Sequence, residues 1–120
     1  MVHKPYIVKL FLHQKRDFIH EKTFVSATYE IKLWEIEDRK RYLLGIKYSL
    51  YLFDPMYSRV LLGFDNHYPK GPHIHFEDRE SEYDFTSIDK LISDFKLEVK
   101  KLGYTIENKK IKKAYHQGNN

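Results

Sequence analysis

Hydrophobic and polar side chains alternate along much of the first two thirds of the chain, which predicts β-strands. The clearest run covers residues 24–36, where polar and apolar positions alternate as in a strand with one buried face. The same period continues in residues 41–53 and 57–64, and the charged residues 37–40 separate the first two runs. Because Asp54-Pro55 interrupts the second run, we expect three consecutive antiparallel strands.

Weaker alternation at both ends of the chain predicts further strands. Residues 6–13 alternate, and Lys15-Arg16-Asp17 then indicates a turn. Residues 83–85 and 104–106 are short runs suited to strands, whereas the acidic residues 77–82 indicate a connection. Together these segments predict an antiparallel sheet of about four to six strands.

The period changes to 3.6 near Thr86, which predicts one main C-terminal helix over residues 87–102. Its apolar stripe consists of Ile88, Leu91, Ile92, Phe95, Val99 and Leu102. Thr86 is the expected N-cap, with Asp89 completing a variant capping box, and Gly103 is the expected C′ residue. With this helix packed on one face of the sheet and Phe95 buried, the chain is an α+β domain over residues 1–120.

Composition limits the number of domains, the possible cysteine chemistry and the location of the protein. The 120 residues fit one domain, and the absence of cysteine excludes disulfides and thiolate metal sites. No segment has the layout of a signal peptide, and no apolar run approaches the roughly 18 residues of a membrane span. We therefore expect a cytoplasmic protein without membrane contact.

The net charge of +4 and the pI of about 9.1 allow a nucleic-acid partner without requiring one. Much of the basic charge lies in the tail from about residue 108, which we expect to be flexible. Lys109 and Lys110 in this tail are candidate phosphate ligands, although lysine-rich tails can also serve solubility alone.

Residues 65–76 carry the densest group of reactive side chains, with three histidines in addition to Asp65 and Lys70. Successive strand residues face opposite sides, so His73 and His75 should share one face, with their imidazoles pointing outward. Pro69, Gly71 and Pro72 predict a turn directly before them.

This group fits cleavage of RNA without a metal. Such cleavage needs a base for a 2′-hydroxyl, an acid for the leaving oxygen and a cation for the phosphorane charge. Histidine suits both proton transfers, so His73 and His75 are the candidate base and acid, and Lys70 is the candidate cation. Tyr68 could stack on a base or only cover the turn.

Two other interpretations of the group remain open. In one, His73 and His75 ligate zinc or another divalent ion together with His67 or Asp65, provided that Lys70 points away. In the other, the group is structural, and Asp65-Asn66 forms an Asx-turn that the histidines help to close.

Three segments of the chain resemble the TumE family of toxins from prokaryotic toxin–antitoxin modules. They are Phe64-Asp65-Asn66-His67, the segment Lys70-Gly71-Pro72-His73-Ile74-His75, and Tyr83-Asp84-Phe85-Thr86-Ser87-Ile88 at the helix start. Matching positions cover about residues 42–102, and the N-terminal third is similar only in strand layout.

The resemblance implies a growth-inhibiting protein encoded beside an antitoxin, with a helix-turn-helix antitoxin as partner and RNA as target. Carried over by position, it makes Asp65, Asn66, His67, His73 and His75 the site candidates, with Asn66 as a substrate-binding residue. Lys70 falls in a spacer that varies within the family. The leading hypothesis is thus an endoribonuclease toxin that uses no cofactor. The alternatives are a non-enzymatic module that binds nucleic acid or antitoxin, and a metal-dependent nuclease that uses the same histidines.

Overall fold

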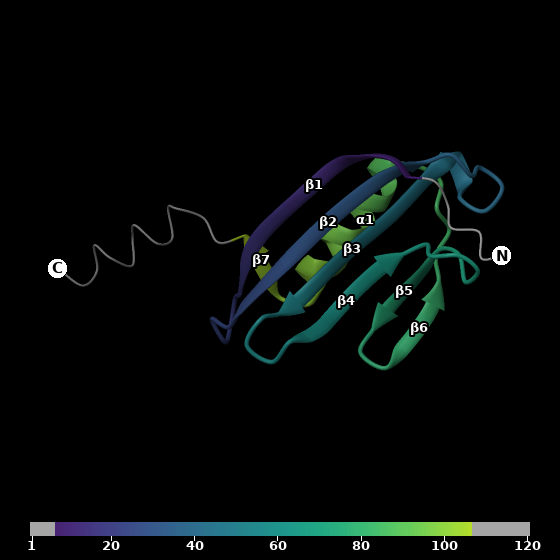
Figure 1. The fold of residues 1–120 in the computed structure, drawn as a ribbon. Coiled ribbons are helices and arrows are strands. Elements are labelled where there is room, and N and C mark those ends of the chain that lie inside the picture. The colour runs from purple at the N-terminus through teal and green to yellow at the C-terminus, as the bar shows by residue number, and fades with distance from the viewer. Residues whose placement is uncertain (1–6, 107–120) are drawn as a thin grey trace.

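The computed structural model describes residues 7–106, which form a seven-stranded antiparallel sheet and one helix that crosses one face of it (Figure 1). The elements are β1 (Ile7–His20), β2 (Ser26–Ile36), β3 (Ile46–Asp54), β4 (Arg59–Asp65), β5 (His73–Phe76), β6 (Arg79–Glu82), α1 (Ile88–Lys101) and β7 (Tyr104–Ile106). The strand order is β6-β5-β4-β3-β2-β1-β7, so β6 and β7 form the two edges. The predicted α+β class is confirmed.

The sheet has seven strands, so the prediction of four to six was too low. The acidic segment that was expected to be a connection contains β6, whose four residues are all exposed. A strand without a buried face has no alternation to reveal it, and backbone pairing with β5 alone defines it. Residues 83–85 form no strand, because Tyr83 donates its N–H to the Pro72 carbonyl and Phe85 is buried in the core.

The predicted turn at Lys15-Arg16-Asp17 is also wrong, because β1 continues through these residues. Lys15 lies opposite Glu30 on β2, and Asp17 accepts a hydrogen bond of 3.0 Å from the Thr28 hydroxyl. Cross-strand partners of this kind stabilise polar residues within a strand.

Two element boundaries differ from the prediction. The strand predicted from residue 41 begins at Ile46, because Leu44 and Gly45 have φ angles of 61° and 65° within a short 3₁₀ turn. The helix N-cap is Ser87 and not Thr86, since the Ser87 hydroxyl accepts a 3.1 Å bond from the Lys90 N–H. At the other end Gly103 has the predicted C′ role, with a φ angle of 94°.

The core lies between α1 and the sheet face beneath it. Leu91, Phe95 and Val99 are the buried helix residues, and the Phe95 ring packs against the rings of Tyr29 and Phe64. Phe95 is 0% exposed, which confirms its predicted burial. On β3 the buried hydrophobic residues are Tyr48, Leu50 and Leu52, as the alternation predicted, so the residues between them point to the opposite face.

Within residues 7–106, no helix combines the length and the apolar character needed to cross a membrane. Lys109, Lys110 and the rest of the expected flexible tail lie outside the described residues.

Candidate functional site

Four neighbouring strands place their polar residues in register on the face opposite α1. Tyr51 of β3 lies across from Gly63 of β4, which lies across from His75 of β5, which lies across from Glu80 of β6. In the next row of the same face, Asp65 lies across from His73. Directly opposed residues share a face, so these side chains meet on one surface of a rigid sheet.

Asp65, His73 and His75 form the centre of this surface. The Nε2 atoms of the two histidines are 2.7 Å apart, and Asp65 lies 3.2 Å from the Nε2 of His73 and 3.5 Å from that of His75. The two imidazoles therefore share one face, as the alternation predicted. The expectation that both point outward is wrong for His73, which is only 7% exposed because the turn and Asp65 cover it, whereas His75 is half-buried.

The outer nitrogen of each ring faces an acceptor. The Nδ1 of His73 lies 2.6 Å from the carbonyl oxygen of Gly71, and the Nδ1 of His75 lies 3.1 Å from a carboxylate oxygen of Glu80. A carbonyl oxygen can only accept, so the Nδ1 of His73 donates, and the Glu80 carboxylate favours a proton on the Nδ1 of His75. With a proton on each Nδ1, the two Nε2 atoms present lone pairs to each other, an arrangement that suits a shared proton or a bound cation between them.

The Asp65 carboxylate is oriented by two further hydrogen bonds. The hydroxyl of Tyr51 donates to Oδ2, and the backbone N–H of His67 donates to Oδ1 at 3.2 Å. Burial, together with the bond to Asp65, raises the pKa of Tyr51, so the phenol stays protonated and remains a donor. Gly63 leaves room for the Tyr51 ring, because a Cβ there would lie 2.7 Å from the ring atom Cδ1.

Lys70 lies beside the cluster and is paired with Glu80. Its ammonium is 2.6 Å from the Glu80 carboxylate, whose Oε1 also faces His75. The hydrogen bond from Lys70 lowers the pKa of Glu80 and keeps this carboxylate ionised. Tyr51 and Glu80 were both missed in the sequence. The isolated Gly63 within an apolar strand was the one available signal for a close approach at Tyr51.

An open pocket of about 510 Å³ gives access to the cluster. It is lined by Asp65, His67, Tyr68, Pro69, Lys70, His73 and His75. His67 is exposed in this pocket, but its ring is not part of the convergent group of Asp65, His73 and His75. The Tyr68 ring is 46% exposed and has the guanidinium carbon of Arg41 4.8 Å from its centroid.

Asn66 differs from the other candidates, because both polar groups of its side chain bind the backbone of β3. Its Oδ1 accepts from the N–H of Tyr48 at 2.9 Å, and its Nδ2 donates to the carbonyl of Ile46 at 2.8 Å. Asn66 is buried, so its side chain holds the start of β3 to the end of β4 and is not open to a substrate.

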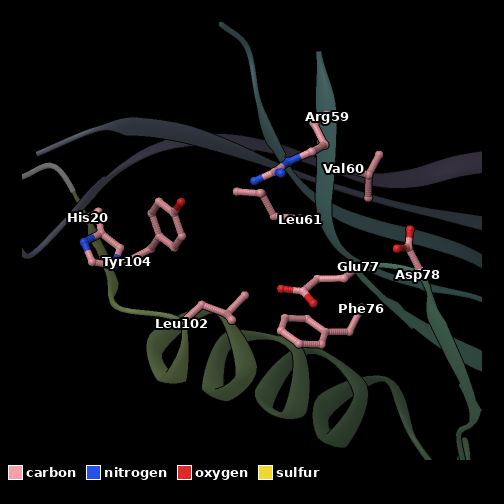
Figure 2. Close-up of a pocket in the computed structure, with 9 residues that line it drawn as sticks. All are labelled: His20, Arg59, Val60, Leu61, Phe76, Glu77, Asp78, Leu102 and Tyr104. Atoms are coloured by element: carbon pink, nitrogen blue, oxygen red, sulfur yellow. The ribbon is translucent and has the colours of Figure 1, made fainter. Parts of the chain in front are cut away.

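A second pocket, of about 470 Å³, lies on the side of the sheet that carries the helix (Figure 2). Figure 2 shows apolar side chains from the helix end and from the sheet around it, with charged groups of Arg59, Glu77 and Asp78 at its border. Among the described residues, three metal-ligating side chains converge only at Asp65, His73 and His75. The second pocket therefore offers a binding surface, and the cluster offers reactive groups.

Fold and site together define a small basic α+β protein with a carboxylate and two imidazoles converging on the open face of its sheet. The model of the family described as "Toxin TumE" matches residues 8–102. The chain thus belongs to the TumE toxin family, and the match includes most of the N-terminal third, where the resemblance had been limited to strand layout. No curated protein and no solved structure matches the chain. Membership of this toxin family implies an antitoxin as partner.

Proposed function

We propose that this toxin is an endoribonuclease whose chemistry takes place at Asp65, His73 and His75. The observation that carries the proposal is the convergence of two imidazole Nε2 atoms and a carboxylate at a pocket open to a substrate. Titratable side chains that converge at a pocket and are oriented by hydrogen bonds are candidates for acid–base chemistry.

The geometry refines how the protons would move. In an in-line displacement the attacking 2′-oxygen and the leaving oxygen lie on opposite sides of the phosphorus. The two Nε2 atoms are only 2.7 Å apart, so His73 and His75 would act as one unit on one of these oxygens. His67, which lines the same pocket, is then the candidate for the other oxygen. This assignment replaces the simple division in which His73 and His75 are base and acid.

The surroundings of the cluster suit an RNA strand. Lys70 lines the pocket and can approach a phosphate, while the exposed Tyr68 ring offers a stacking surface for a base. The net charge of +4 favours association with a polyanion. We expect the antitoxin to be a helix-turn-helix protein, as the resemblance implied.

The test uses induced expression of the wild type and of single variants, followed by growth and by cleavage of labelled RNA with purified protein. His75→Ala and His67→Ala should each lower the cleavage rate about 100-fold or more, because general acid–base groups contribute that much. His13→Ala is the matched control, since His13 is an exposed histidine that binds Glu30 on another part of the sheet. If the wild-type protein stops growth but leaves RNA intact, the proposed nuclease activity is refuted and the alternative of a non-enzymatic binding module is favoured.

A further inference from the structure

We infer that Asp65, His73 and His75 bind a divalent transition-metal ion. The inference names an ion for the site of the proposed function, and with that ion bound His73 and His75 would serve as its ligands and not as the groups that move a proton. It rests on the proposed function only where it concerns cleavage, because metal binding can be measured without RNA. The starting point is the meeting of the Nε2 atoms of His73 and His75 with the Asp65 carboxylate, whose ligand atoms all lie within 4.8 Å of one another.

The donor set and its spacing fit such an ion. Two imidazole nitrogens and one carboxylate oxygen are ligands that zinc, manganese and iron accept. Bond lengths of about 2.0–2.2 Å place neighbouring ligands of a tetrahedral ion about 3.3 Å apart. The two histidine–Asp65 distances of 3.2 and 3.5 Å match this value. The nitrogens, 2.7 Å apart, would have to separate slightly, which would also relieve the repulsion between their lone pairs.

Each of the three ligands is held by an outer partner. The Nδ1 of His73 donates to the Gly71 carbonyl, the Nδ1 of His75 lies 3.1 Å from the Glu80 carboxylate, and Tyr51 donates to the Asp65 carboxylate. Metal-binding histidines almost always donate their second N–H to a carboxylate or a backbone carbonyl, which fixes the tautomer and the ring orientation. A histidine pair that served only to close the turn would have no need for both Nε2 atoms to face each other.

The local charge also permits a cation. In the sequence analysis, the positive charge of Lys70 argued against a metal site. In the structure the Lys70 ammonium is 2.6 Å from the Glu80 carboxylate, which compensates this charge. With neutral imidazoles, Asp65 supplies one negative charge, so a divalent ion would leave the site with one positive charge. Three protein ligands leave coordination positions open toward the pocket, as in catalytic metal sites, and a phosphate oxygen or a water could occupy them.

A proton shared between the Nε2 atoms of His73 and His75 is the competing explanation of their 2.7 Å separation. Measuring the metal content of the protein distinguishes a shared proton from a bound ion. Full-length protein without a histidine tag is stripped with chelator, dialysed, and titrated with Zn²⁺, Mn²⁺ and Co²⁺ by calorimetry and elemental analysis. We expect one ion per chain for at least one metal, and a higher melting temperature when that ion is bound. If none of the three metals shows saturable binding of one ion per chain, the inference is overturned.

Variants locate the site. His75→Ala, at a half-buried ligand, should weaken binding at least 10-fold, and Glu80→Ala should weaken it about 10- to 100-fold, as is usual for outer partners. His13→Ala should bind like the wild type, and circular dichroism checks that each variant is folded. Unchanged affinity in His75→Ala would also overturn the inference.

RNA cleavage separates this inference from the proposed function. Metal bound at the cluster without any RNA cleavage would refute the nuclease and leave the metal site. Cleavage by protein that binds no metal would refute the metal site and leave the nuclease.

Discussion

Replacing Gly63 by alanine should push the Tyr51 ring out of its place above β4. Gly63 lies directly opposite Tyr51, and an added Cβ would stand 2.7 Å from Cδ1 and 3.2 Å from Cζ of the ring. The ring cannot move away freely, because its hydroxyl is bound to Asp65. The substitution therefore combines a steric clash with the weakening or loss of this hydrogen bond.

The expected cost follows from three contributions. Overpacking of a site costs about 1–3 kcal/mol. A hydrogen bond to a charged group contributes about 1.5–3 kcal/mol. Alanine is favoured over glycine within a strand by about 0.5–1 kcal/mol, which offsets part of the loss. Because the Tyr51 ring is only half-buried and can yield toward solvent, the free energy of unfolding should fall by about 2–4 kcal/mol.

The assay is a double-mutant cycle in urea, with Gly63→Ala introduced into the wild type and into Tyr51→Ala. Without the ring, the new methyl group meets no obstacle, so the same substitution should be neutral or stabilising by up to about 1 kcal/mol. Tyr51→Phe is the control that keeps the ring and removes only the hydroxyl, and there the steric part of the cost should remain. Equal costs of Gly63→Ala in the wild type and in Tyr51→Ala would refute the reasoning.

Two further predictions concern a buried amide and a partly exposed ion pair. Asn66→Ala leaves two backbone groups of β3 without their partners and should cost about 2 kcal/mol or more in urea melts; a loss under about 0.5 kcal/mol would refute its structural role. The hydrogen bonds from Lys90 and then Tyr83 lower the pKa of Asp94, so this carboxylate should contribute stability above about pH 4 that is lost as the pH falls through its lower folded value. Melting temperatures of the wild type and Asp94→Asn should therefore converge between about pH 5 and pH 2, and a constant difference would contradict this sign.

The central strands and the helix could be predicted because burial of one face imposes a period on the sequence. Residues of β2 and β3 alternate between core and surface, and the stripe through Phe95 repeats every turn of α1. The edge strand β6 and part of β1 escaped this logic, whereas the other edge strand, β7, coincides with the strand predicted for residues 104–106. The four exposed residues of β6 carry no period, and the charges at Lys15-Arg16-Asp17 resemble a turn until cross-strand partners are known.

The candidate site was predictable to the extent that it lies within one short stretch of chain. Asp65, His73 and His75 are close in sequence, and the spacing of the two histidines placed them on one face. Tyr51 and Glu80 lie on other strands, and the pairing of β3 with β4 and of β5 with β6 brings them to the site. Strand register is a tertiary property, so no local pattern could assign these two partners.

The position of the site on a sheet has a consequence for its chemistry. Asp65, His73 and His75 lie on paired strands, where backbone hydrogen bonds on both sides limit movement. His67 and Lys70 lie in the turn between β4 and β5, which is closed by a 3.1 Å bond from the Gly71 N–H to the His67 carbonyl. Groups on strands are held more accurately than groups on loops. The three convergent ligands are therefore suited to fix a proton or a metal ion in place, while the turn residues have the freedom to adjust to a substrate.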